Sequence, residues 1–370
     1  MEPGSEAELA DAVRGANGPL SVRGGGTRGG AAQGEVLSVA GLSGVELYEP
    51  GALTIVARAG TPLSEVEEAL AEEGQRLPFE PMDHRALLGT EGAPTVGGMV
   101  AANVSGPRRV QAGACRDSLI GVRFVDGSGA IVKNGGRVMK NVTGYDLVKL
   151  MAGSRGTLGV LTEVAFKVLP APDAAATLTL GPLDAARGVA AMALALGSPF
   201  EVTGAAQAPD GRVHLRLEGF EMSVAYRAER LTAALSAYGA TEVARDRGEV
   251  DALWHSIRDV KPLADGPGDV WRISVKPSDG PAVLAALGHP PALLDWGGGL
   301  VWVRLPDATD VRAQLGDLPG YATLVRASAE TRARLPAIPP EPGPLAALAA
   351  GLRQKFDPRG ILNPGLMGPS

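Results

Sequence analysis

The chain has little of what several classes of protein require. It has one cysteine, Cys115, so one chain holds no internal disulfide, no cysteine-ligated iron–sulfur cluster and no multi-cysteine zinc site. Its four histidines, His84, His214, His255 and His289, do not lie at the spacing of paired metal ligands. The sequence therefore predicts no metal site. Electrons that leave a redox cofactor here need an external acceptor.

Long apolar runs and basic clusters are missing as well. No run approaches the length of a membrane-spanning helix, and the first residues lack the basic and apolar regions of a signal peptide. The net charge is −6, and lysine and arginine are spread along the chain, which argues against a nucleic-acid partner. We expect a cytoplasmic protein without direct membrane insertion. Its 370 residues predict two domains.

Glycine is abundant, and it is concentrated where a strand ends at Gly24, Gly25 and Gly26. Glycine lets peptide N–H groups approach phosphate oxygens and permits positive φ, so this loop suits a bulky anion. Thr27 adds a hydroxyl and Arg23 a charge. A strand-like segment follows the loop instead of a helix, which argues against a Rossmann fingerprint. Taken alone, the motif is equally compatible with a flexible turn.

Three more sequence runs support the interpretation of the glycine loop as a cofactor-binding loop. Residues 94–106 read PTVGGMVAANVSG, with almost no large side chains and room for a flat ring or a sugar phosphate. Residues 140–164 read KNVTGYDLVKLMAGSRGTLGVLTEV, and residues 355–365 read KFDPRGILNPG. The four runs together are far more specific than any one of them.

In this order the runs resemble the FAD-linked oxidases with a PCMH-type, or vanillyl-alcohol-oxidase type, flavin domain. Within these, the chain is most similar to the FAD-binding subunits of bacterial glycolate oxidases. The resemblance implies an α+β fold with a two-subdomain PCMH-type FAD-binding domain at 1–172. It also implies an α+β cap domain with an antiparallel sheet at 173–335. A linker and C-terminal segment at 336–370 would return to the FAD domain.

The resemblance also implies which residues bind the cofactor. They are Arg23, Gly24, Gly25, Gly26, Thr27, Pro81, Met82, Thr95, Val96, Gly97, Gly98, Ala101, Asn103, Gly106, Gly159, Val160, Leu161 and Asn363. Some relatives attach the flavin through a histidine where this chain has Thr27, so FAD is expected to bind noncovalently. A link through Cys115 does not match the family's positions, and a small buried thiol is preferred. Arg155 stands where the family has an acid.

The pattern of the cap region predicts amphipathic helices at 183–196, 223–238 and 249–259, on one face of an antiparallel sheet. The predicted strands are 201–207, 212–217, 270–275, 300–304 and 321–326. Arg272 and Lys276 share one face of a predicted strand and are candidate catalytic residues that would bind a substrate carboxylate. An exposed polar face of a half-buried sheet explains them as well. Trp296 and Trp302 flank a predicted turn. Their side chains would line the flavin ring, pack in the core or contact a partner protein.

Two functions remain open. The first is an FAD-binding subunit of a glycolate oxidase complex, in which a second FAD-containing subunit handles the small 2-hydroxy acid and an iron–sulfur subunit carries electrons onward. Contact with the inner membrane would then occur only through these partners. The second is a self-sufficient FAD-dependent 2-hydroxy-acid dehydrogenase. The missing histidine pair favours the first. A UDP-sugar reductase with the same flavin fold is disfavoured by residues 355–365.

Overall fold

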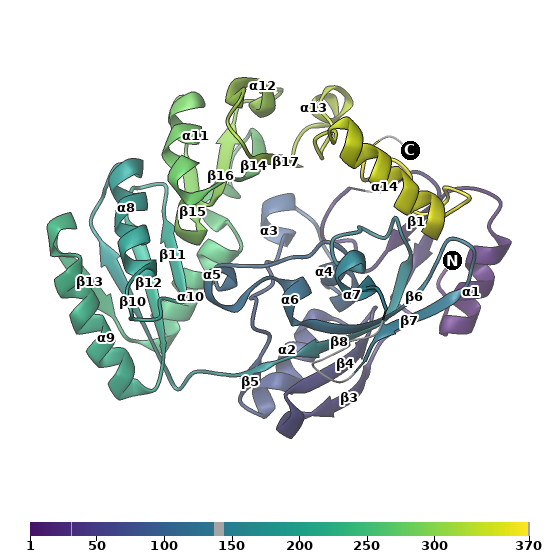
Figure 1. The fold of residues 1–370 in the computed structure, drawn as a ribbon, viewed down its shortest axis with the longest axis horizontal. Coiled ribbons are helices and arrows are strands. Elements are labelled where there is room, and N and C mark those ends of the chain that lie inside the picture. Colours follow the sequence, from purple (N-terminus) through teal and green to yellow (C-terminus); the bar gives the residue numbers. More distant parts are fainter. Residues whose placement is uncertain (31, 137–143, 369–370) are drawn as a thin grey trace. The chain divides into compact units, whose positions relative to one another are not determined.

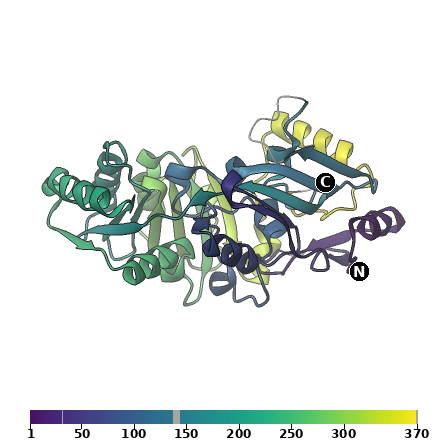
Figure 2. The same ribbon diagram turned by 90° about the horizontal axis from the view of Figure 1, so that it is seen from below.

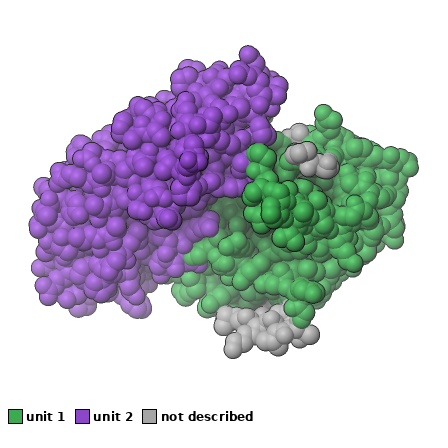
Figure 3. Space-filling view, turned by 45° about the horizontal axis from the view of Figure 1, so that its top comes forward, with its two compact units in different colours: residues 1–105, 113–171, 340–370 green, residues 106–112, 172–339 purple. Residues whose placement is uncertain are grey.

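The computed structural model, drawn as a ribbon in Figures 1 and 2, describes residues 1–30, 32–136 and 144–368. They form two compact units (Figure 3). The first unit comprises 1–105, 113–171 and 340–370, and the second comprises 106–112 and 172–339. The chain therefore crosses between the units four times.

The first unit is an α+β assembly. Its helices are α1 (Glu6–Gly15), η1 (Pro50–Ala52), α2 (Leu63–Glu72), α3 (Arg85–Leu88), α4 (Val96–Ala101), α6 (Cys115–Ser118), α7 (Leu147–Met151) and α14 (Gly343–Phe356). Its strands are β1 (Leu20–Arg23), β2 (Glu35–Ser38), β3 (Val45–Glu49), β4 (Thr54–Arg58), β5 (Gln75–Arg76), β6 (Leu119–Val125), β7 (Ile131–Gly135), β8 (Val160–Lys167) and β9 (Leu169–Pro170). An antiparallel sheet has the order β3-β4-β8-β6-β7, and β1 pairs with β2 in parallel.

The C-terminal tail is built into the first unit by packing and by hydrogen bonds. Ile361 and Leu362 join a buried apolar cluster with Leu9 and Val13 of α1. The guanidinium of Arg359 donates to the carbonyl oxygens of residues 13, 14 and 16 at the end of α1. Because a helix end leaves carbonyl groups unpaired, this arginine satisfies acceptors that would otherwise need water.

The second unit is an α+β assembly around one large antiparallel sheet. Its helices are α5 (Arg109–Ala112), α8 (Ala185–Leu196), α9 (Glu221–Ala234), η2 (Ser236–Tyr238), α10 (Arg247–Arg258), η3 (Lys261–Leu263), η4 (Pro277–Asp279), α11 (Gly280–Ala286), η5 (Trp296–Gly298), α12 (Val311–Leu315) and α13 (Ala329–Arg334). Its strands are β10 (Ala174–Leu180), β11 (Gly204–Gln207), β12 (Val213–Gly219), β13 (Thr241–Ala244), β14 (Asp269–Ser274), β15 (Ala292–Asp295), β16 (Leu300–Leu305) and β17 (Tyr321–Arg326). The order of strands is β13-β10-β12-β11-β15-β16-β14-β17.

This sheet is covered on both faces, whereas the sequence predicted helices on one. The main apolar cluster joins α8, α9 and α11 to residues such as Leu178 and Leu215. Thr177 points the other way along β10 and accepts a 2.9 Å hydrogen bond from the Trp254 indole of α10. Gly204 leaves room for that indole, since an added Cβ would lie 2.7 Å from the ring.

Segment 106–112 belongs to the second unit, although the sequence placed it in the first domain. A buried ion pair explains the difference: Arg108 donates two hydrogen bonds to the Glu218 carboxylate, with Nε 2.8 Å from Oε2. Arg216 lies 3.7 Å from the same carboxylate. The Trp296 indole also donates to the carbonyl oxygen of Gly106 at 3.0 Å. These contacts hold the segment within the second unit.

We predict that Glu218→Ala strongly destabilises the second unit. Removing one partner of a buried ion pair costs about 3–5 kcal/mol because the other charge stays buried. Glu201→Ala is a matched control, since Glu201 pairs with Arg227 but its side chain is 78% exposed, and we expect a loss below about 1 kcal/mol. Urea denaturation followed by tryptophan fluorescence is a suitable measurement because all four tryptophans lie in this unit. Equal losses in both variants would contradict the role of the buried pair.

Candidate functional site

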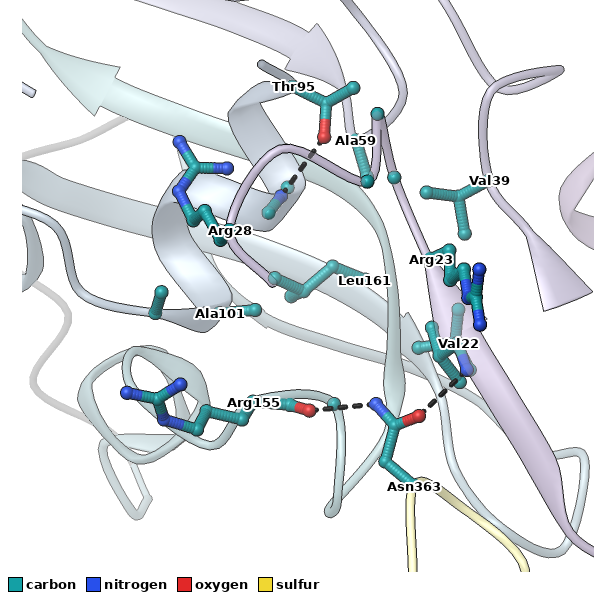
Figure 4. Close-up of a pocket in the computed structure, with 18 of the residues that line it drawn as sticks. Val22, Arg23, Arg28, Val39, Ala59, Thr95, Ala101, Arg155, Leu161 and Asn363 are labelled. Atoms are coloured by element: carbon teal, nitrogen blue, oxygen red, sulfur yellow. Dashed lines mark hydrogen bonds between the residues drawn. The ribbon is translucent and has the colours of Figure 1, made fainter. Parts of the chain in front are cut away.

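The first unit contains a pocket of 280 Å³ at the glycine loop, here called the glycine-loop pocket (Figure 4). Six segments contribute to it: the loop after β1, the residue after β2, the residue after β4, α4 with the residues that flank it, the turn before β8, and the C-terminal tail. The residues that line it are Val22, Arg23, Gly24, Gly25, Gly26, Thr27, Arg28, Gly29, Gly30, Val39, Ala59, Thr95, Gly97, Gly98, Ala101, Ala102, Arg155, Gly156, Gly159, Val160, Leu161, Asn363 and Leu366.

The glycines of the loop have different physical roles. At Gly25 an added Cβ would overlap the carbonyl oxygen of Ala93, and at Gly24 it would overlap the hydroxyl of Thr95. These two glycines therefore allow the loop to pack against the segment before α4. Gly26 has φ +69° and nothing within 4 Å of an added Cβ. Only Gly26 of the three has the left-handed conformation that turns successive N–H groups toward one side.

The second run, at 94–106, forms a helix start that packs against β4 and the residues after it. Thr95 caps α4, and its hydroxyl accepts a hydrogen bond from Gly98 N at 3.3 Å. Gly97 N donates to the carbonyl oxygen of Ala59 at 2.8 Å. An added Cβ at Gly97 would lie 2.6 Å from that of Ala59, so glycine is required for this close approach.

Arg155 and Asn363 connect four segments of the pocket. The Asn363 amide accepts from Val22 N at 2.7 Å and donates to the Arg155 carbonyl oxygen at 2.8 Å. Arg155 N donates to the carbonyl oxygen of Ala101 at 2.8 Å. Both of these contacts use the backbone of Arg155, which has φ +52°. These contacts therefore do not depend on which side chain residue 155 carries.

Most of the residues that the sequence assigned to the cofactor lie together in the pocket. Five of the assigned residues are not part of the pocket lining: Pro81, Met82, Val96, Asn103 and Gly106. Pro81, Met82 and Val96 are buried. The Asn103 carboxamide accepts from Arg116 N, and Gly106 lies in the second unit.

Sequence reasoning missed several lining residues. They are Val22, Arg28, Gly29, Gly30, Val39, Ala59, Ala102, Arg155, Gly156 and Leu366. Proximity along the chain was an available signal for eight of them, since Ala102, Arg155 and Gly156 lie inside a quoted run and the other five adjoin one. Val39 and Ala59 gave no such signal, because β2 and β4 bring them to the pocket from other parts of the chain.

The two arginines of the loop differ in environment. Arg23 is exposed, and its Nε donates to the Ser21 hydroxyl at 3.3 Å. Arg28 is half-buried, and its Nε and Nη2 atoms are buried without a hydrogen-bond partner among the described residues. Burial lowers the pKa of Arg28 to about 10, against opposing effects of Cys115 and Asp83. Its guanidinium is therefore still charged at neutral pH.

Cys115 and His84 lie in the first unit but do not line the pocket. Burial raises the pKa of the Cys115 thiol, so it stays protonated and unreactive. Burial, and then the charge of Arg28, lower the pKa of His84 to about 3. His84 is therefore neutral at pH 7 and adds no positive charge beside Arg28.

The candidate residues of the cap do not form a shared site. Arg272 is half-buried on β14, with its guanidinium 5.2 Å from the Trp296 ring centre, and Arg109 lies 4.4 Å from that centre. Lys276 is exposed beyond the end of the strand. Trp302 is 4% exposed, so it packs in the core and is not available to a partner. Large exposed apolar side chains in this unit include Phe220, Met222 and Tyr226.

In the described part of the chain, no group of three or more His, Cys, Asp or Glu residues has the arrangement needed to hold a metal ion. No helix in this part combines the length and apolarity needed to cross a bilayer.

Comparison with known proteins identifies the family. Residues 1–135 match the family model of an FAD binding domain. The chain is 38% identical over 338 residues to the glycolate oxidase subunit GlcE of Escherichia coli, covering 90% of this chain and 87% of the relative. The chain belongs to the GlcE family of FAD-linked oxidases. Its cofactor is FAD.

Other relatives share less of their length with the chain. The glycolate oxidase subunit GlcD of Bacillus subtilis is 34% identical over 34% of this chain and 25% of the relative. A D-lactate dehydrogenase of Archaeoglobus fulgidus is 33% identical over 46% of this chain and 38% of the relative. The solved structure of an alkyldihydroxyacetonephosphate synthase is 16% identical, with a TM-score of 0.67 over 98% of this chain and 76% of that one. At this identity it supports the predicted PCMH-type fold alone.

The lining of the glycine-loop pocket fits the chemistry of FAD. Gly26 offers open backbone in a left-handed conformation, and Arg28 offers buried donors without partners. Among the described residues, those that line the pocket include three arginines and neither aspartate nor glutamate. An electropositive lining with exposed backbone suits a dinucleotide whose diphosphate is negatively charged.

We predict that Gly25→Ala weakens FAD binding. The new Cβ would force the loop away from Ala93, and overpacking of this kind costs about 1–3 kcal/mol. If this cost falls on the bound conformation, FAD affinity drops about tenfold. Titration of flavin-free protein with FAD measures the effect, and Gly51→Ala is the control because nothing lies within 4 Å of its added Cβ. Unchanged affinity in a folded Gly25→Ala protein would mean that the loop does not shape the FAD site.

Proposed function

We propose that this chain is the FAD-binding subunit of a glycolate oxidase complex. It binds FAD noncovalently and takes part in transferring electrons from the oxidation of glycolate to glyoxylate. The observation that carries the proposal is the 38% identity to Escherichia coli GlcE across 90% of the chain. The glycine-loop pocket supports it, since its lining suits FAD.

The composition of the chain supports a partner with an iron–sulfur cluster. When bound, FAD supplies the acceptance of two electrons, a reaction that amino-acid side chains do not provide. Those electrons must leave the subunit, and a chain with one cysteine cannot ligate a cluster that would carry them. Cys115 is also fully buried. We therefore propose a second flavoprotein subunit and an iron–sulfur subunit as partners in the cytoplasm, with any membrane contact made through them.

The chain's own residues have a holding and shielding role in this proposal. The loop at Gly24–Gly26 and the start of α4 present backbone groups to the cofactor. Asn363 fixes β1 against the turn at Arg155, which keeps the pocket closed on the side of the tail. Val22 and Leu161 line the pocket with apolar surface that excludes water.

We predict that acid precipitation releases all FAD from the purified protein. No histidine, cysteine or tyrosine is among the described residues that line the glycine-loop pocket. These lining residues therefore offer no side chain of those three types for a covalent bond to the flavin. The measurement is the flavin absorbance of the supernatant and of the pellet after precipitation. A yellow pellet would contradict noncovalent binding.

We also predict that the chain alone oxidises glycolate and D-lactate very slowly. Co-expression with the two partner classes should give co-elution in size-exclusion chromatography and glycolate-dependent dye reduction. The control is the pair of partners expressed without this chain, which we expect to be inactive.

Two results would exclude the subunit role. One is rapid anaerobic bleaching of the flavin in the isolated chain by glycolate, unaffected by a chelator; it would favour the self-sufficient dehydrogenase with Arg272 or Lys276 at the substrate. The other is full activity of the partners when this chain is absent.

A further inference from the structure

Arg28 is a charged side chain whose hydrogen-bond donors are not all satisfied by the described part of the protein. Its Nε and Nη2 atoms are shielded from solvent and make no hydrogen bond to any described residue. A buried donor without a partner costs about 1–3 kcal/mol, and more when it is charged. A buried polar group without a partner in a native protein calls for an explanation, and a bound ligand is one that would supply the missing acceptors.

The carboxylate whose charge acts on Arg28 makes no hydrogen bond to its buried Nε and Nη2 atoms. Asp83 influences Arg28 electrostatically, but its carboxylate is occupied by Arg85. Arg85 Nε lies 3.1 Å from Oδ1 and its Nη2 lies 2.7 Å from Oδ2. The charge of Arg28 is therefore left for a group that is not part of the protein.

Arg28 lies at the glycine-loop pocket. It lies two residues after Gly26, in the same loop, and it lines the glycine-loop pocket. Its Nη1 atom would be 2.9 Å from a Cβ at Gly98, so the guanidinium lies against the start of α4. Figure 4 shows the side chains of Arg28 and Arg23 on opposite sides of the loop.

We propose that Arg28 binds the diphosphate of FAD and is the main source of charge for holding it, in place of the exposed Arg23. The inference rests on the proposed FAD-binding function. A permanently charged guanidinium is best paired with a permanently charged group. The diphosphate carries its charge in every redox state, whereas the oxidised flavin ring is neutral. A planar guanidinium also matches the oxygens of a phosphate in a bidentate manner.

The test compares flavin-free wild-type protein with Arg28→Met, Arg28→Lys, Arg23→Met and Arg58→Met, each titrated with FAD, ADP and riboflavin. ADP contains the diphosphate without the flavin, and riboflavin contains the flavin without a phosphate. Arg58 pairs with Glu46 on the surface of the same unit and lies outside the pocket lining, so Arg58→Met is the matched control.

We expect Arg28→Met to weaken FAD and ADP binding at least about tenfold while riboflavin binding is unchanged. The FAD and ADP affinities of Arg28→Lys should lie between those of Arg28→Met and wild type, because lysine keeps the charge but lacks the planar guanidinium that can donate two parallel hydrogen bonds. Arg23→Met should lose less than Arg28→Met, and Arg58→Met should match wild type. Unchanged ADP affinity in Arg28→Met overturns the proposal, as does a loss confined to riboflavin. If wild type itself binds no FAD, the proposed function fails instead.

A second measurement needs no variant, so it applies even if Arg28→Met does not fold. Wild-type protein is treated with phenylglyoxal, which modifies arginine, and each modified arginine is located by peptide mass spectrometry. ADP should protect Arg28 and leave modification of Arg58 unchanged. Protection by riboflavin but not by ADP would overturn the proposal.

Discussion

The amide of Asn363 joins parts of the chain that are far apart in sequence. It bonds to Val22, 341 residues earlier, and to Arg155, 208 residues earlier. The neighbouring Leu362 forms an isolated bridge with Leu20. The entry to the glycine loop is therefore set by residues near the end of the chain. The pocket has its shape only when the tail is in place, so the tail is an integral part of the glycine-loop pocket.

The sequence predicted those turns, loops and helices that are determined by residues close together in the chain. The sequence Asp-Gly-Ser-Gly at 126–129 is typical of a turn, and it joins β6 to β7, with Asp126 accepting hydrogen bonds from Ser128 and Ala130. The glycine loop links two strands as predicted, and α8, α9 and α10 lie within a few residues of their predicted bounds. The confirmed family resemblance came from four motifs, since their order is far more informative than any single one.

What the sequence could not supply depended on tertiary contacts. Strand β10 was missed because it begins with three alanines, which have little β-propensity; pairing with β12 and β13 on its two sides holds it. Thr61 followed by Pro62 is typical of a helix N-cap, but the Thr61 hydroxyl donates to the carbonyl oxygens of Gly44 and Arg58, and the helix begins at Leu63. Arg28 was overlooked because nothing local distinguishes a buried arginine from an exposed one.

The four crossings of the chain decide how the protein can be exchanged with its relatives. Glu218 is in the stretch 172–339, while its ion-pair partner Arg108 is in the short stretch 106–112. A chimera that swaps 172–339 alone would combine an acid from one parent with an arginine position from the other. The second unit therefore behaves as a module only when 106–112 is transferred with it, so the two stretches are constrained to diverge as a matched pair.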